Sequence, residues 1–146
     1  MVPDIIAIGL LLAVVSACDR RTWPFLAVIG LTWAATSAFD ASLPILSAIF
    51  ARVVVDATGA LLAWAVEPPK RQWCLWMGGV RVTFVLMIML HACFWTARAL
   101  GVDIWLVYAE GLNTLALLQL GFLAWPGLTR LLVLRPKIGG RLDAAD

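Results

Sequence analysis

Charged residues are scarce in this sequence. Only 14% of its 146 residues are Asp, Glu, Lys or Arg, whereas 63% are hydrophobic and the mean hydropathy is +0.95. A soluble domain carries about a quarter charged residues, so this chain has too little polar surface to face water. The composition predicts an integral membrane protein in contact with the lipid bilayer. The net charge of +2 is too small to indicate a nucleic-acid partner.

Residue types that hold metals and cofactors are also few. His91 is the single histidine, and the three cysteines form neither a C-x-x-C pair nor a His/Cys cluster. These counts argue against a structural zinc site and against a haem held by two histidines. The sequence also lacks H-E-x-x-H, G-x-S-x-G and glycine-rich phosphate-binding motifs. We therefore expect no metal site, no cofactor and no enzymatic activity.

Long apolar runs are what the sequence does contain, and each ends at charged or turn-forming residues. We predict an all-α integral membrane protein with five transmembrane helices, at about 2–18, 23–39, 43–66, 73–97 and 104–126. The first two runs are short for a hydrocarbon core about 30 Å thick, so they should stand upright or thin the bilayer.

The end of the chain is expected to leave the membrane after the fifth span. Trp125-Pro126-Gly127 should end that helix. Residues 1–135 would then form one helical domain, with 129–135 at the interface and 136–146 as a mobile cytoplasmic tail. Four basic residues near this end are predicted to bind anionic lipid or a cytoplasmic partner: Arg130, Arg135, Lys137 and Arg141.

The first run has an alternative interpretation as a lipoprotein signal, because Val15-Ser16-Ala17-Cys18 resembles a lipobox. The first four residues, Met1-Val2-Pro3-Asp4, include an acid and no Lys or Arg, which is the reverse of what export signals use. Cleavage would also leave Arg20 and Arg21 on the outer side of the membrane. A first transmembrane span is therefore favoured, and lipidation of Cys18 stays open.

Lys and Arg are distributed unevenly between alternate connections. With five spans, eight of them lie on one side of the membrane and one on the other, while Arg52 and Arg81 fall inside spans. Positive residues collect on the cytoplasmic side, so the count predicts the N-terminus outside and the C-terminus in the cytoplasm. Tryptophans near the span ends agree with this threading. Abundant Arg, Ala and Leu suggest a bacterial or phage source, and hence a multi-pass protein of the bacterial inner membrane.

Polar and ionisable residues inside the predicted spans form a candidate polar core. They are Arg52, Asp56, Arg81, His91, Glu110 and Asn113. Counting depth at 1.5 Å per residue pairs Arg52 with Glu110, with His91 nearby, and pairs Asp56 with Arg81. These pairings would neutralise four buried charges.

Small residues flank the charges of the third span, at Ala48, Gly59 and Ala63. Small side chains let membrane helices approach closely, so this stripe should face the other helices. We expect the third, fourth and fifth spans to form the core, with the first two outside. In the fifth span, Gln119 points away from the face that carries Glu110 and Asn113.

Two classes of function stay open. Ionisable residues in a membrane favour transport or permeability, with Asp56, His91 and Glu110 as titratable stations for protons, ions or a small solute. Five short spans are few for a complete carrier, so this protein would act as a homo-oligomer or as a subunit of a larger complex. A phage holin is one version, since the threading is similar to that of three-span holins, although five spans depart from that pattern. The other class is a non-catalytic structural or adaptor protein whose charge pairs hold the helices together.

Overall fold

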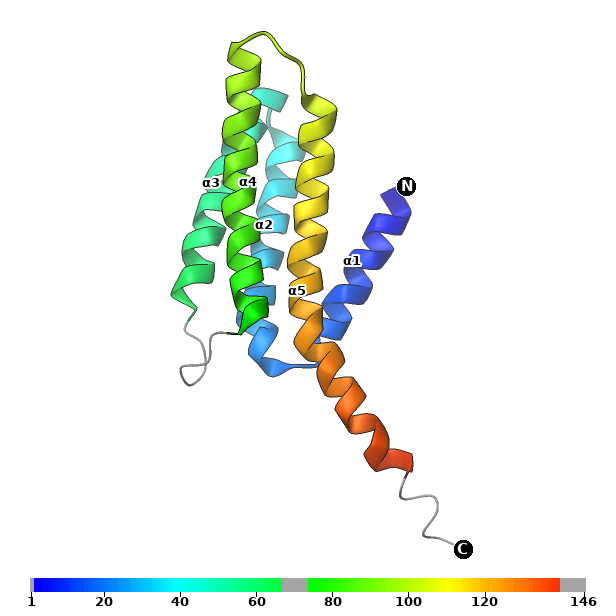
Figure 1. The fold of residues 1–146 in the computed structure, drawn as a ribbon. Helices are drawn as coiled ribbons and strands as arrows, with labels where there is room; N and C mark the ends of the chain where they lie inside the picture. The colour runs from blue at the N-terminus through cyan, green and yellow to red at the C-terminus, as the bar shows by residue number, and fades with distance from the viewer. Residues whose placement is uncertain (1, 67–73, 140–146) are drawn as a thin grey trace, which may run out of the picture.

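The computed structural model describes residues 2–66 and 74–139, and within these ranges the regular structure is entirely helical. The predicted Pro-rich connection between the third and fourth spans lies outside the described residues. The helices are shown in Figure 1 and have these bounds: α1 Val2–Ala17, η1 (a 3-10 turn) Arg20–Thr22, α2 Trp23–Ser42, α3 Ile45–Ala65, α4 Leu75–Ala99 and α5 Trp105–Gly139.

Four of these helices are long and apolar enough to cross a membrane. The segments are Arg20–Ser42, Ile45–Ala65, Leu75–Ala99 and Trp105–Val133. Within the described residues the prediction of an all-helical fold is confirmed, and these four helices fit a membrane protein. Helix α1 has 16 residues and is a shorter apolar helix. At 1.5 Å per residue it is about 24 Å long, less than the hydrocarbon thickness of about 30 Å.

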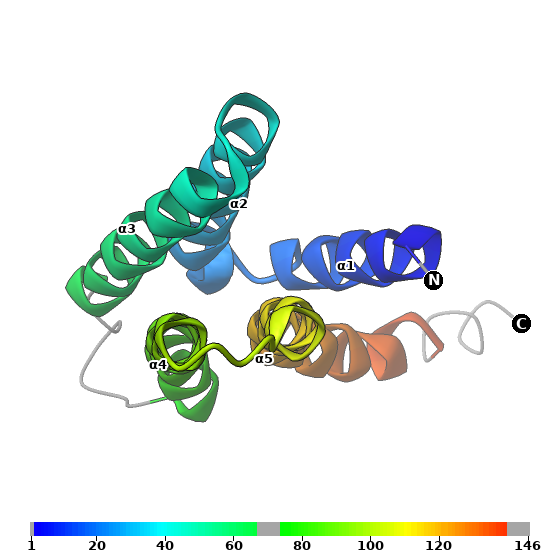
Figure 2. The same cartoon turned by 90° about the horizontal axis from the view of Figure 1, so that it is seen from above.

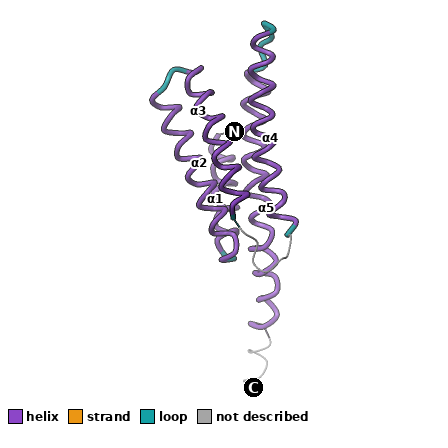
Figure 3. The backbone as a smooth tube through the Cα atoms, turned by 90° about the vertical axis from the view of Figure 1, so that its left-hand side faces the viewer, coloured by secondary structure: helices purple, strands orange, loops and turns teal. Residues whose placement is uncertain are grey.

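The helices pack in an order that differs from their order in the chain. Helix α4 contacts both α3 and α5, α2 contacts α3, and α1 contacts α5. Seen from above in Figure 2, α1 and α2 diverge from the short connection that joins them. Figure 3 shows the C-terminal part of α5 continuing beyond the ends of the other helices. As expected, α3, α4 and α5 pack together, and α2 and α1 pack on the outer sides of α3 and α5.

The main apolar core fills the half of the bundle near the α1–α2 connection. Its buried residues come from four helices: Phe25, Val28, Ile29, Ala60, Ala63, Trp76, Met77, Val80, Phe84, Met87, Leu120 and Leu123. A smaller cluster of Ile49, Phe94 and Tyr108 lies towards the α4–α5 turn. Large apolar side chains elsewhere are exposed on all five helices, which suits a surface that faces lipid rather than water.

The inward stripe of α3 is confirmed. Ala48, Asp56, Gly59 and Ala63 are all buried. A Cβ on Gly59 would lie 2.6 Å from the Phe84 ring and would also collide with a methyl group of α2. The glycine therefore allows α3 to sit closely between α2 and α4.

Helix α5 does not end at Trp125-Pro126-Gly127 as predicted, but runs on to Gly139. Proline lacks the N–H that a helix interior uses, yet membrane helices tolerate it where neighbouring helices support the backbone. Here the support is α1. A Cβ on Gly127 would overlap the Val15 carbonyl oxygen, so glycine lets the two backbones touch. The first residues of the predicted tail, 136–139, are helical, and 140–146 lie outside the described residues.

The connection between α1 and α2 is held by Asp19. Its carboxylate accepts a hydrogen bond of 3.0 Å from the backbone N–H of Arg21 and further bonds from the Arg21 guanidinium. Arg130 of α5 lies 4.0 Å away. The Thr22 hydroxyl donates to the Ser16 carbonyl oxygen at 2.6 Å. The Arg21 guanidinium holds the pKa of the Asp19 carboxyl below its usual value of 3.8.

Replacing Gly127 by alanine should weaken the α1–α5 contact. Backbone on both sides of the overlap cannot turn away as a side chain would, so we expect a loss of about 1–3 kcal/mol in stability. Gly121→Ala is the matched control, because nothing lies within 4 Å of a Cβ there. Thermal unfolding in detergent should show a lower midpoint for Gly127→Ala only. Equal midpoints for the two variants would contradict the close contact.

The Asp19 contacts predict a pH dependence. Because the folded-state pKa is depressed, the stabilisation is present above the unfolded value and is lost as the pH falls through the folded value. Asp19→Asn should therefore cost about 1–2 kcal/mol at pH 7, with the difference from wild type shrinking below pH 3.8. Denaturation in detergent at both pH values measures it. A cost that is independent of pH would show that the carboxylate charge is not what matters.

Candidate functional site

Three side chains from three helices form a hydrogen-bonded chain in the protein interior. The Asp56 carboxylate (Oδ2) of α3 lies 2.8 Å from Nε2 of His91 on α4. Nδ1 of the same imidazole lies 2.8 Å from the hydroxyl of Tyr108 on α5. His91 and Tyr108 are 1% and 0% exposed, and Asp56 is 9% exposed. We call these residues the Asp–His–Tyr centre.

The chemistry of the three groups fixes the positions of the protons. An ionised carboxylate only accepts, so Nε2 of His91 donates to Asp56. In a neutral imidazole the other nitrogen then accepts, and the Tyr108 hydroxyl donates to Nδ1. If His91 took up a proton, both ring nitrogens would donate, and the Tyr108 O–H would have to turn away.

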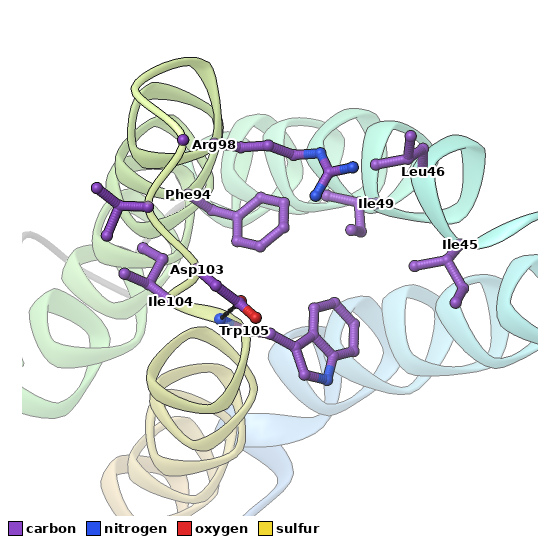
Figure 4. Close-up of a pocket in the computed structure, with 10 residues that line it drawn as sticks. Ile45, Leu46, Ile49, Phe94, Arg98, Asp103, Ile104 and Trp105 are labelled. Carbon is purple, nitrogen blue, oxygen red and sulfur yellow. Dashed lines mark hydrogen bonds between the residues drawn. The ribbon is translucent and has the colours of Figure 1, made fainter.

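Aromatic rings exclude water from the tyrosine end of the centre. The rings of Phe94 and Tyr108 lie 4.4 Å apart, and those of Trp105 and Tyr108 lie 5.8 Å apart. Phe94 and Trp105 also line a cavity of about 760 Å³ near the α4–α5 turn (Figure 4). There Asp103 accepts a 3.0 Å hydrogen bond from the backbone N–H of Trp105 at the start of α5. The centre is thus separated from this cavity by two aromatic side chains.

The aspartate end faces a cavity of about 580 Å³ that residues of all five helices line. Asp40, Arg52, Asp56 and Asn113 are on its wall, and most of the remaining lining is apolar. Small-molecule sites in proteins have volumes of about 300–1,000 Å³ and a similar mixture of lining residues. We call this space the central cavity. It brings a buried ionisable centre within reach of a small ligand.

The predicted pair of Arg52 with Glu110 is wrong. Arg52 is paired with Asp40 of α2, and its Nε donates to Oδ1 at 2.9 Å. Glu110 is exposed. Depth counting placed the two residues at one level but carried no information about which way each helix faces. It also missed Asp40, because α2 extends as far as Ser42 and brings this carboxylate onto a helix.

The predicted pair of Asp56 with Arg81 is also wrong. Arg81 is buried and reaches the C-terminal end of α3, where Nε and Nη2 donate to the carbonyl oxygens of Ala63 and Val66 at 3.0 and 2.8 Å. Its guanidinium carbon lies 5.0 Å from the centre of the Trp64 ring. The last carbonyls of a helix have no partners within the helix and carry partial negative charge, which explains the attraction.

The inward face of α5 differs from the prediction as well. Gln119, expected to point away from the core, is 1% exposed, and its amide nitrogen lies 3.8 Å from the sulfur of Met87. Asn113 is exposed overall but lines the central cavity. Sequence reasoning did not identify Tyr108. The spacing of Tyr108, Leu112, Gln119 and Leu123 places all four residues on one face of the helix, and this pattern could have identified Tyr108.

The basic residues near the C-terminus are only partly described. The Arg130 side chain is 54% exposed and lies beside Asp19. Arg135 and Lys137 belong to the last turns of α5, and Arg141 lies outside the described residues. In the ranges 2–66 and 74–139, no three His, Cys, Asp or Glu residues gather in a way that could hold a metal ion.

Comparisons with protein-family models, with curated proteins and with solved structures give no match for this chain. The geometry of the Asp–His–Tyr centre and of the central cavity is therefore the basis for assigning a function.

The observed pairs predict which charge exchanges restore stability. Asp40→Arg and Arg52→Asp should each cost about 1 kcal/mol or more, and the double variant should recover part of the loss, since the two side chains pair with each other. The double exchange of Asp56 with Arg81 is the control and should recover nothing. Thermal unfolding of single and double variants measures both interactions. Recovery in the control but not in the first pair would overturn the described pairing.

Proposed function

We propose that this chain is a small multi-pass membrane protein that works in transport, with the Asp–His–Tyr centre taking up and releasing a proton. The observation that carries the proposal is the position of Asp56. Its carboxylate is on the wall of the central cavity and is also hydrogen-bonded to a buried imidazole. Intramembrane ionisable groups are costly and are characteristic of ion and proton pathways. A carboxylate and an imidazole that share a hydrogen bond are groups that can accept and release a proton.

The apolar core would close one half of the proposed transporter. The central cavity reaches Asp56, but the half of the bundle near the α1–α2 connection is filled by tightly packed apolar side chains such as Phe25, Met77 and Leu123. This apolar cluster lies between the centre and the α1–α2 end of the bundle. Transport would therefore need a second arrangement of the helices, as carriers that expose a central site alternately do.

The proposal also includes a membrane topology and an oligomeric state. Helix α1 would be a fifth, short span, with the N-terminus outside and the basic C-terminal end in the cytoplasm of a bacterium. Anionic lipid headgroups would contact Arg130 and the basic residues beyond it. The chain would act as a homo-oligomer or as part of a larger complex, because five short spans are few for a complete carrier.

A structural or adaptor role is the second candidate. Two of the intramembrane cations are already used to join helices, since Arg81 binds the end of α3 and Arg52 joins α3 to α2. In that case the Asp–His–Tyr centre would only hold α3, α4 and α5 together. Loss of Asp56 would then lower stability without changing any flux.

Proton flux separates the two candidates. Purified protein is reconstituted into liposomes that contain a pH-sensitive dye, and a pH gradient is imposed. Asp56→Asn should slow the flux by about a hundredfold, the scale of a positioned proton-transfer group. Glu110→Gln makes the same chemical change in the same membrane-spanning region, but at an exposed site, and should leave the flux unchanged. Equal flux for wild type and a normally inserted Asp56→Asn protein would exclude the transport proposal.

A further inference from the structure

The central cavity carries a net negative charge within the described residues. Three formal charges line it: Asp40, Arg52 and Asp56. Arg52 and Asp40 neutralise each other in their ion pair. His91 is neutral when Asp56 is ionised and the Tyr108 hydroxyl donates to Nδ1. The carboxylate of Asp56 is therefore the charge that no cation balances in this part of the chain.

One oxygen of that carboxylate is available to a ligand. Oδ2 is bonded to His91, but Oδ1 accepts no hydrogen bond among the described residues. In the described part of the chain, no fully buried side-chain oxygen or nitrogen lacks a partner, so Oδ1 is not fully buried. Asp56 lines the central cavity, so a ligand in that cavity can reach its carboxylate. A buried carboxylate with a free oxygen attracts a positive group.

The remaining wall is suited to an organic group rather than to a hydrated ion. Apolar side chains line it from several helices: Leu10, Leu26, Ile29, Phe84, Leu117 and Leu120. The ring of Trp33 is also on the wall, and aromatic rings attract weakly hydrated cations. Small metal cations need several oxygen ligands, and the described residues bring no such group together. A bulky cation with spread-out charge matches both the charge and the apolar surface.

Two of the helices that line the central cavity have little contact with each other. Both α1 and α2 contribute to the wall, and they diverge from their connection rather than packing along their lengths (Figure 2). A hydrophobic cation partitions into the lipid and reaches this side of the bundle directly. A strongly hydrated solute would first have to lose its water.

We infer that the central cavity binds a hydrophobic organic monocation and that this cation exchanges with one proton at the Asp–His–Tyr centre, an inference that rests on the proposed transport function. The charges balance. With the centre protonated, the cavity wall is neutral and empty of cation. When one monocation binds beside Asp56, one proton leaves for the solution, and the wall is neutral again.

The titratable and charged groups near Asp56 come from α2, α3, α4 and α5. Asp40 of α2 and Arg52, one turn away on α3, line the same cavity and pair with each other. His91 of α4 is hydrogen-bonded to the Asp56 carboxylate, and Tyr108 of α5 is hydrogen-bonded to His91. A ligand cation at Oδ1 therefore competes with a proton on the carboxylate–imidazole pair, and binding should weaken as the pH falls.

Two ions of the same shape and opposite charge test the inference. Binding of tetraphenylphosphonium and of tetraphenylborate to the full chain in lipid nanodiscs is measured by calorimetry, with empty nanodiscs subtracted. Asp56→Asn should weaken tetraphenylphosphonium binding by at least about tenfold, because a charge interaction inside a protein exceeds 1.4 kcal/mol. Asp56→Glu keeps the charge and should retain most of the affinity, and Glu110→Gln should match wild type. Tetraphenylborate should bind no more weakly to Asp56→Asn than to wild type.

The proton side is measured in the same samples. Adding tetraphenylphosphonium to weakly buffered protein at a pH where the centre is protonated should release protons, and Asp56→Asn should release none. Equal affinity for the cation in wild type and Asp56→Asn would overturn the inference. An equal loss of affinity for tetraphenylphosphonium and for tetraphenylborate in Asp56→Asn would overturn it as well. Infrared difference spectra then distinguish the two proposals. A carboxylic acid band of Asp56 that still titrates leaves the transport proposal standing, whereas a centre that takes up no proton removes both.

Discussion

A carboxylate halfway along a membrane-spanning helix is the constraint on which much of this structure depends. Asp56 has no bulk water to solvate it, and an uncompensated charge at that depth is unfavourable. The protein solvates it with dipoles: the Nε2–H of His91 donates to one oxygen, and the Tyr108 hydroxyl donates to the other side of the ring. A tight ion pair with an arginine would have cancelled the charge. A dipole-solvated carboxylate keeps its charge available to a proton or a ligand.

The two intramembrane arginines, Arg52 and Arg81, bind groups other than the Asp56 carboxylate. Arg81 is drawn to the carbonyls at the end of α3, and Arg52 is held by Asp40. Both residues therefore stabilise the frame around the centre, and neither binds Asp56. Structural and functional roles are thus divided among charges that look alike in the sequence. The packing of α4 between α3 and α5 makes this division possible, because it brings His91 to both neighbours.

Sequence reasoning predicted the elements better than their contacts. Apolar runs and turn residues located every helix boundary to within a few residues except the end of α5, because the bilayer demands long uninterrupted helices. Pro126 was expected to end α5, but the helix continues past it, where Gly127 packs closely against α1. The predicted charge pairs were wrong for a different reason. The depth of a residue along a helix follows from its position in the sequence, whereas the direction of its side chain depends on how the neighbouring helices pack. Tyr108 and Gln119 are both buried on the inward face of α5. Sequence reasoning missed this face because it assumed that Glu110 and Asn113 pointed inward.

The contact between Val15 and Gly127 joins the first helix to the last. A chain made from its N-terminus presents α1 to the membrane long before α5 exists. During that interval α1 lacks its main packing partner, and the central cavity lacks one of its walls. The bundle can therefore be completed only after α5 has been made.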